Sequence, residues 1–123
     1  MTIPKFRAWT EEGEVMYYDV YPFKDDTLLL SYDEISFDEV PASDFILMQS
    51  TGLVDMYDEE IFEGDIVKVL NSLYTVFYDS EKGSFRLKPH DKRWHTDYMS
   101  NFSHGGNFEV IGNMYEGVKD DNS

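Results

Sequence analysis

The chain has 123 residues, a formal net charge of −15 at pH 7 and no cysteine. This length predicts one domain, and the absence of cysteine excludes disulfides, thiolate metal ligands and a cysteine nucleophile. No apolar signal region follows Met1, and apolar runs such as 45–48 are far too short to span a bilayer. We therefore expect a cytoplasmic protein with no membrane partner.

The first half of the chain predicts short strands separated by turns. Residues 5–9 and 14–21 alternate in polarity and predict a hairpin closed by a turn that contains Gly13. Further segments are expected in this order: a turn at 22–26, a strand at 27–32, an acidic loop or short strand at 33–44, and a buried strand at 45–49.

The middle of the chain centres on a predicted turn at Gly64. Residues 51–53 are expected to turn away from the preceding strand, and 54–60 to form an acidic connection with at most one helical turn. Gly64 can adopt φ > 0 without steric cost, and the β-branched residues that follow favour a strand at 65–70. Asp65 is expected to accept hydrogen bonds from backbone N–H groups of this turn.

The second half predicts two more hairpins and a closing strand. Strands at 65–70 and 73–78 are expected to meet across Asn71-Ser72, and the loop 79–83 leads into the alternating strand 85–88. Residues 74–78 are apolar on both faces, which favours a curled sheet or barrel over an open sheet. The remaining expectations are an irregular stretch at 89–106 with a short helix at 97–102, and a closing strand at 108–111.

These elements predict a mainly β fold. We expect a small, strongly bent sheet or SH3-like barrel with one short helix at most. The single β domain would cover residues 1–118, and residues 119–123 would form a frayed polar tail. The residues expected to set the turns are Gly52, Gly64, Asp65 and Gly112.

Three stretches taken together resemble the YopX family of phage and prophage proteins. They are 5–9 with Met16-Tyr17, then 48–53 leading into 61–67, and finally 109–116. The chain departs from the family pattern at 55–60, where Asp55-Met56-Tyr57-Asp58-Glu59-Glu60 replaces a hairpin rich in Lys, Asn and Gly. The resemblance implies a small, mainly β, phage-encoded protein in the cytoplasm of a bacterial host, and it assigns no catalytic or cofactor-binding residue.

The acids are unevenly distributed, since residues 8–67 hold seventeen acidic side chains and one basic side chain, Lys24. Such a surface can present itself to a basic host protein, and it can replace duplex DNA, which carries one negative charge per roughly 1.7 Å, in a basic groove. The competing interpretation is a solvated acidic surface without a partner. The residues predicted to form an acidic interaction face are Asp25, Asp26, Asp33, Glu34, Asp38, Glu39, Asp58, Glu59 and Glu60.

A basic and aromatic stretch at 82–95 offers an alternative function. Lys and Arg would hold phosphates while aromatic rings stack on bases, as in proteins that bind single strands. The ordinary interpretation is a strand with one solvated face, and the net charge of −15 makes nucleic acid the less favoured partner. The residues of this alternative nucleic-acid face are Lys82, Arg86, Lys88, Lys92, Arg93 and Trp94.

Other chemistry is not indicated. The loop residues His90, Asp91, His95, Asp97 and His104 match no standard zinc spacing, and the sequence has no phosphate-binding loop or dinucleotide fingerprint. We therefore predict no enzyme, no metal and no cofactor. The many tyrosines and the edge strands of a small β protein leave self-association open.

Overall fold

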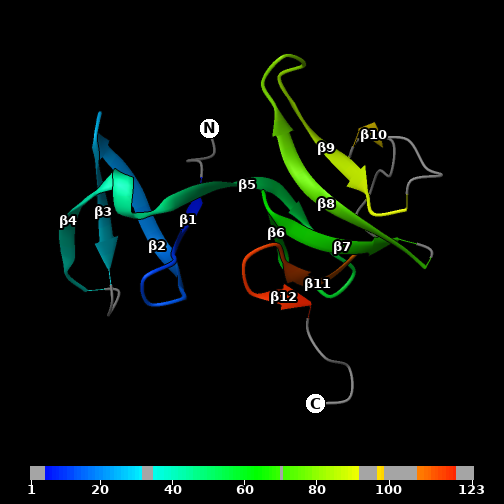
Figure 1. The fold of residues 1–123 in the computed structure, drawn as a ribbon, viewed down its shortest axis with the longest axis horizontal. Coiled ribbons are helices and arrows are strands. Elements are labelled where there is room, and N and C mark those ends of the chain that lie inside the picture. The colour runs from blue at the N-terminus through cyan, green and yellow to red at the C-terminus, as the bar shows by residue number, and fades with distance from the viewer. Residues whose placement is uncertain (1–4, 32–34, 70, 92–96, 99–107, 119–123) are drawn as a thin grey trace. The chain divides into compact units, whose positions relative to one another are not determined.

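The computed structural model describes residues 5–31, 35–69, 71–91, 97–98 and 108–118. The chain divides into two compact units, Met1–Ser50 and Thr51–Ser123, with the boundary inside strand β5. The N-terminal unit is an antiparallel sheet in the order β4-β3-β2-β1-β5, and β6 continues this order beyond β5 (Figure 1). Its elements are β1 (Phe6–Thr10), β2 (Val15–Lys24), β3 (Thr27–Ser31), β4 (Phe37–Pro41), the 3-10 turn η1 (Ala42–Asp44) and β5 (Ile46–Val54).

The core of the N-terminal unit lies on one side of this sheet. Ala8 on β1, Val20 on β2, and Leu28 and Leu30 on β3 are buried together. Side chains opposite each other on paired strands share a side of the sheet, and this explains why Tyr17 and Leu47, both opposite Ala8, pack against the same cluster. Tyr17 also makes an edge contact with Phe45, at a ring-centroid distance of 6.1 Å.

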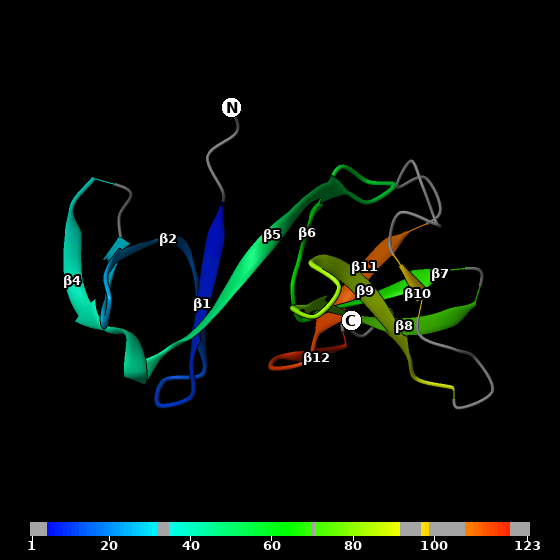
Figure 2. The ribbon, with the colours of Figure 1, turned by 90° about the horizontal axis from the view of Figure 1, so that it is seen from above.

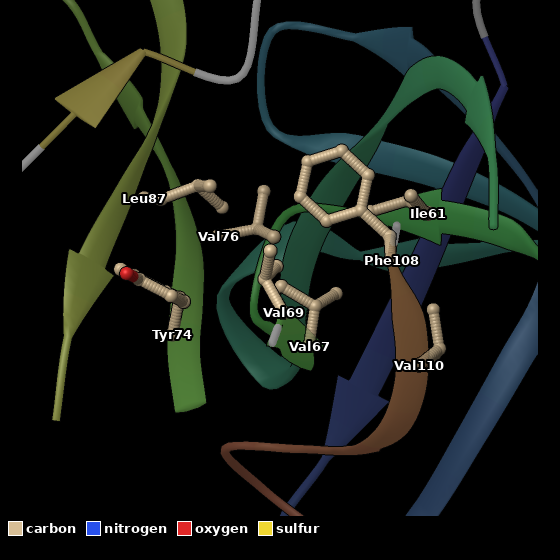
Figure 3. Close-up of a cluster of buried hydrophobic side chains, with 8 residues drawn as sticks. All are labelled: Ile61, Val67, Val69, Tyr74, Val76, Leu87, Phe108 and Val110. Atoms are coloured by element: carbon tan, nitrogen blue, oxygen red, sulfur yellow. The ribbon is translucent and has the colours of Figure 1, made fainter. Parts of the chain in front are cut away.

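The C-terminal unit contains a second antiparallel sheet in the order β10-β9-β8-β7-β11-β12. Its core consists of Ile61, Val67, Val69, Tyr74, Val76, Leu87, Phe108 and Val110 (Figure 3). The strands of this unit are β6 (Glu60–Phe62), β7 (Asp65–Val69), β8 (Ser72–Asp79), β9 (Ser84–Pro89), β10 (Asp97–Tyr98), β11 (Glu109–Asn113) and β12 (Gly117–Val118).

The turn at Gly64 connects β6 to β7 and confirms the prediction for this residue. Gly64 has φ of 90°, its N–H donates to the Val76 carbonyl (2.7 Å), and its carbonyl accepts from the Met114 N–H (2.9 Å). The Asp65 carboxylate accepts from the Phe62 N–H at 2.7 Å and is 2% exposed. The turn therefore satisfies its own backbone and bonds to β8 and to the residue after β11.

The prediction of a mainly β fold is confirmed, and the described strands do not close into a barrel. The two strand orders are open, ending at β4 and β6 in one case and at β10 and β12 in the other. The only helical segment in the described residues is the short turn η1. The prediction of a single domain over 1–118 concerns cooperative folding and stays a prediction, and the expected tail at 119–123 lies outside the described residues.

Several local expectations were wrong in detail. Residues 51–53 do not turn away, because β5 continues through them: it pairs with β1 in its first half and neighbours β6 in the strand order (Figure 2). Gly52 adopts φ of 82° inside this strand, and the Thr51 hydroxyl donates to the Ile61 carbonyl at 2.8 Å. The expected turn at 22–26 is shorter, because β2 extends to Lys24 through an irregular step in its pairing with β3.

The two segments in which the sequence allowed a helical turn are not helical where the structure describes them. Residues 55–59 form a turn held by hydrogen bonds, and Asp97 and Tyr98 belong to β10, opposite Leu87 and Arg86 of β9. The rest of the segment 97–102 lies outside the described residues. The hairpin between β7 and β8 is confirmed, with Val69 opposite Ser72.

Gly112 has no room for a side chain, and substitution there tests the β11–β12 pairing. A Cβ at this position would lie 2.1 Å from the carbonyl oxygen of Gly117 and 2.7 Å from the Cα of Val118. We expect Gly112→Ala to lower the free energy of unfolding by about 3 kcal/mol, near the top of the usual range for overpacking. Urea denaturation would measure the change.

The matched control is Gly83→Ala in the exposed turn between β8 and β9. Gly83 also has positive φ (63°), but a Cβ there would meet nothing within 4 Å. This variant should therefore lose only the cost of a left-handed alanine, about 1–2 kcal/mol. If both variants lose the same free energy of unfolding, β12 can move away from the added methyl group without cost. That result would contradict the steric argument.

Candidate interaction surface

Four of the predicted interaction acids lie on the outer part of the N-terminal sheet, two in the β2–β3 turn and two on β4. Asp25 and Asp26 form the turn between β2 and β3, while Asp38 and Glu39 lie on β4, and all four are exposed. The Ala42 N–H donates to the Asp26 carbonyl at 2.9 Å, so the turn lies beside the residue that follows β4. We call these four residues the β4 acidic group.

Lys24 accompanies the β4 acidic group. Its Nζ lies 3.5 Å from a carboxylate oxygen of Glu39 and 5.6 Å from the ring centroid of Phe23. The side chain of Lys24 is 63% exposed and that of Glu39 is 39% exposed. An ion pair so accessible to water contributes about 0–1 kcal/mol to the free energy of unfolding. Another cation can therefore replace Lys24 at Glu39 at little cost.

Aromatic side chains lie next to these acids. Phe37 on β4 and Tyr21 on β2 form an edge contact with ring centroids 5.7 Å apart, and both remain more than 40% exposed. In the register Glu39 is opposite Leu29, which is opposite Tyr21, so Glu39 and Tyr21 share the side of the sheet that faces away from the Leu28–Leu30 core. The surface beside β4 is therefore both acidic and aromatic.

The other predicted acids do not join this group in the described structure. Asp33 and Glu34 lie outside the described residues. Asp58, Glu59 and Glu60 belong to the C-terminal unit, where Asp58 and Glu59 are exposed and Glu60 is half-buried. The predicted acidic face therefore corresponds to two separate sets, one in each unit.

A buried carboxylate holds the loop that carries Asp58 and Glu59. Asp55 Oδ1 accepts from the N–H groups of Tyr57 (2.8 Å) and Glu59 (2.9 Å), and its Oδ2 accepts from the N–H of Val110 on β11 (2.9 Å). Asp55 is 4% exposed. The sequence pattern predicted only an acidic connection here. An Asp that accepts from N–H groups two and four residues later is typical of a side-chain cap on a tight loop, and this was the local signal for its role.

The alternative nucleic-acid face is partly neutralised from within. The Arg86 guanidinium donates to Asp79 Oδ2 at 2.9 Å, and Asp79 Oδ1 accepts from the N–H groups of Glu81 and Lys82. Phe85 packs against the C-terminal core and makes an edge contact with Tyr78 at 5.2 Å. Lys82 and Lys88 are exposed, whereas Lys92, Arg93 and Trp94 lie outside the described residues.

The described residues offer no metal site. No group of three or more His, Asp or Glu side chains in the described part of the chain could hold an ion. The imidazole Nε2 of His90 lies 2.7 Å from the hydroxyl of Thr75. Among the same residues, no helix has the length and apolar character needed to cross a membrane.

Fold and surface together define a class: a small protein of two antiparallel β units with exposed charged residues on an edge strand and in turns. The YopX family model matches residues 5–119, so the chain belongs to the YopX family, a family of phage and prophage type. A crystal structure of protein EF1440 from Enterococcus faecalis is similar, with a TM-score of 0.64 and 27% identity over 94% of this chain and 96% of that one. No curated protein matches.

The buried Asp55 carboxylate should be essential for the 55–59 loop. Asp55→Asn keeps the size of the side chain but turns one oxygen into an N–H donor, which would face backbone N–H donors. We expect a loss of about 1–3 kcal/mol in the free energy of unfolding, the cost of buried groups left without partners. Asp58→Asn on the same loop is exposed and should stay within about 0.5 kcal/mol in the same urea titration. A similar loss in both variants would contradict the role given to Asp55.

The ion pair between Asp79 and Arg86 should make stability depend on pH in the acidic range. The hydrogen bond from Arg86 lowers the pKa of Asp79 below its ordinary value of 3.8, and the two backbone N–H groups lower it further. A carboxyl whose pKa is lower in the folded state stabilises the fold above its unfolded pKa, and this contribution is lost as the pH falls through the folded pKa. Asp79→Asn should therefore reduce the fall in melting temperature between pH 4 and pH 2. If the melting temperature of this variant falls as much between pH 4 and pH 2 as that of the unsubstituted protein, other carboxyl groups cause the fall.

Proposed function

We propose that this protein is a non-enzymatic phage or prophage accessory protein, a binding module that engages a basic host protein through its acidic surface. The observation that carries the proposal is the β4 acidic group. Four exposed carboxylates lie on β4 and in the β2–β3 turn, with Asp38 and Glu39 on opposite faces of the sheet. Lys24 is the single base among residues 8–67. Fixed charges on a folded scaffold attract a partner of opposite charge and speed its encounter.

The separation between buried and exposed acids supports this proposal. Asp55 and Asp65 accept backbone hydrogen bonds inside the C-terminal unit and serve the fold. No corresponding hydrogen bond from the backbone engages the carboxylates of the β4 acidic group among the described contacts, and the ion pair with Lys24 is weak. These charges are therefore available to a partner at small cost in stability.

Mimicry of DNA is the more specific form of the same proposal. A basic groove that normally holds phosphates would accept carboxylates instead, and the bound protein would exclude duplex DNA from that groove. The contrary idea, nucleic-acid binding through 82–95, receives less support because Arg86 is paired with Asp79 and Phe85 is packed on the core. It stays a prediction, which an electrophoretic shift assay with single-stranded DNA and RNA would test.

The proposal predicts binding that depends on the position of the charges. Protamine, an arginine-rich protein, is a suitable probe in fluorescence anisotropy titrations at several salt concentrations. The double variant Asp38→Asn with Glu39→Gln should weaken binding about threefold to tenfold, as expected for charges at the rim of an interface. Affinity should also fall as salt rises, because salt screens exposed charges.

The control removes the same number of charges from the C-terminal unit. Glu81→Gln with Glu116→Gln changes two exposed acids, and the carbonyl oxygen of glutamine can still accept the bond that Glu116 receives from Asn113. This variant should change the affinity for protamine less than about twofold, because charges outside the binding site act only through the screened net charge. Equal weakening by both double variants, or an affinity independent of salt, would reject the acidic surface as the binding site.

A further inference from the structure

Strand β4 ends the N-terminal sheet and leaves one of its edges without a neighbour among the described residues (Figure 1). It pairs with β3 over its whole length, from Phe37 opposite Ser31 to Pro41 opposite Thr27. Every residue of β4 except the half-buried Val40 is exposed. The N–H and C=O groups on such an outer edge are a template on which another strand can pair.

The charges of β4 argue against a second copy of the same chain on this edge. An antiparallel β4–β4 pair centred on Glu39 would place the two Glu39 side chains opposite each other. An antiparallel pair centred between residues 38 and 39 would place Asp38 of each copy opposite Glu39 of the other copy. Like charges directly opposite in a sheet are destabilising, so the acids that protect this edge from self-pairing favour a strand that carries lysine or arginine.

Lys24 shows how a basic side chain fits beside this edge. Its ammonium group reaches both the Glu39 carboxylate and the ring of Phe23, which combines an ion pair with a cation–π contact. The rings of Phe37 and Tyr21, which contact each other, are also exposed. A partner lysine on this side would lay its aliphatic stem on the rings and its ammonium near Glu39.

We infer that β4 is the docking edge for an extended, basic segment of the partner, which adds to the N-terminal sheet as an additional antiparallel or parallel strand. Side chains of the added strand alternate between the two faces. Its basic residues lie on the face of Glu39, Phe37 and Tyr21, and its apolar residues lie on the face that carries Val40 and Asp38. Main-chain hydrogen bonds supply affinity and the alternating side chains supply selectivity. This inference rests on the proposed function and names the structural form of the partner's binding segment.

The test uses the peptide acetyl-Lys-Val-Lys-Tyr-Lys-Val-Lys-amide and a second peptide of the same sequence with every internal amide N-methylated. The two have equal charge, but the second cannot donate main-chain hydrogen bonds. We expect the first peptide to bind, to slow amide hydrogen exchange in β4, and to bind about tenfold more tightly than the N-methylated peptide. Isothermal titration with the full chain measures the affinities, and NMR exchange locates the strand.

Three variants sharpen the test. Lys24→Gln removes the internal competitor for Glu39 and should strengthen binding of the first peptide about twofold to fivefold. Glu39→Lys should abolish this binding, whereas Glu81→Lys, the same charge change on the β8–β9 turn, should leave most of it. Both substituted side chains at 39 and 81 are exposed, so neither variant is expected to unfold the chain.

The outcomes separate this inference from the proposed function. Equal affinity for the two peptides, with loss on Glu39→Lys, would overturn strand addition and leave the acidic surface standing. Failure of both the peptides and protamine to bind would overturn the two proposals together. Dimers in light scattering that dissociate when the first peptide is added would identify a second copy as the natural occupant and would also overturn this inference.

Discussion

Buried carboxylates that accept backbone hydrogen bonds are the interaction on which the C-terminal unit depends. Asp55 connects its own loop to β11, a residue pair 55 positions apart in the sequence, and Asp65 closes the turn that precedes β7. In a protein of net charge −15, each further buried carboxylate destabilises the fold, because it loses its hydration and is repelled by the other acids. These two acids are tolerated because N–H groups replace the water around them, and such charge-assisted bonds are stronger than neutral ones.

The same residue type therefore has two functions in this chain, and burial distinguishes them. Asp55 and Asp65 are nearly inaccessible and stabilise turns, while Asp25, Asp26 and the acids of β4 are open to solvent. A count of acids in the sequence treats all of them as one surface. The structure assigns some of this charge to the scaffold and leaves the remainder at strand edges and turns, where it acts on the surroundings.

Local chemistry made part of this architecture predictable. The turn at Gly64 and the bond to Asp65 depend on a few neighbouring residues, and the first hairpin and the β7–β8 hairpin have the same local origin. The course of β5 was not predictable in this way, because Gly52 and Thr51 are typical of a turn unless the partner strands on both sides are known. The contact between Asp55 and Val110 was missed for the same reason, since only the tertiary fold brings β11 beside the loop.

The candidate site shows the same limit. The sequence indicated which half of the chain is acidic, but the meeting of Asp25 and Asp26 with β4 depends on the register of two successive hairpins. One irregular step in β2, between Pro22 and Lys24, sets where that turn lies and brings Lys24 to Glu39. A shift of one residue in the pairing of β3 with β4 would move Glu39 to the core side of the sheet and leave the outer face without its carboxylate.

An exposed edge strand needs protection, and the form of the protection carries information about its partner. A neutral or apolar edge can pair with strands of any charge. An edge that carries both acidic and basic side chains repels most strands only weakly. Both charged residues of β4 are acidic, and a single lysine, Lys24 on β2, forms an ion pair with one of them. Water already weakens this contact. Under the proposal, such an edge disfavours its own copies and acidic strands, and another cation can replace Lys24 at Glu39 at little cost. Under the proposed function, protection against misassembly and selection of a basic partner are two consequences of the same pair of carboxylates.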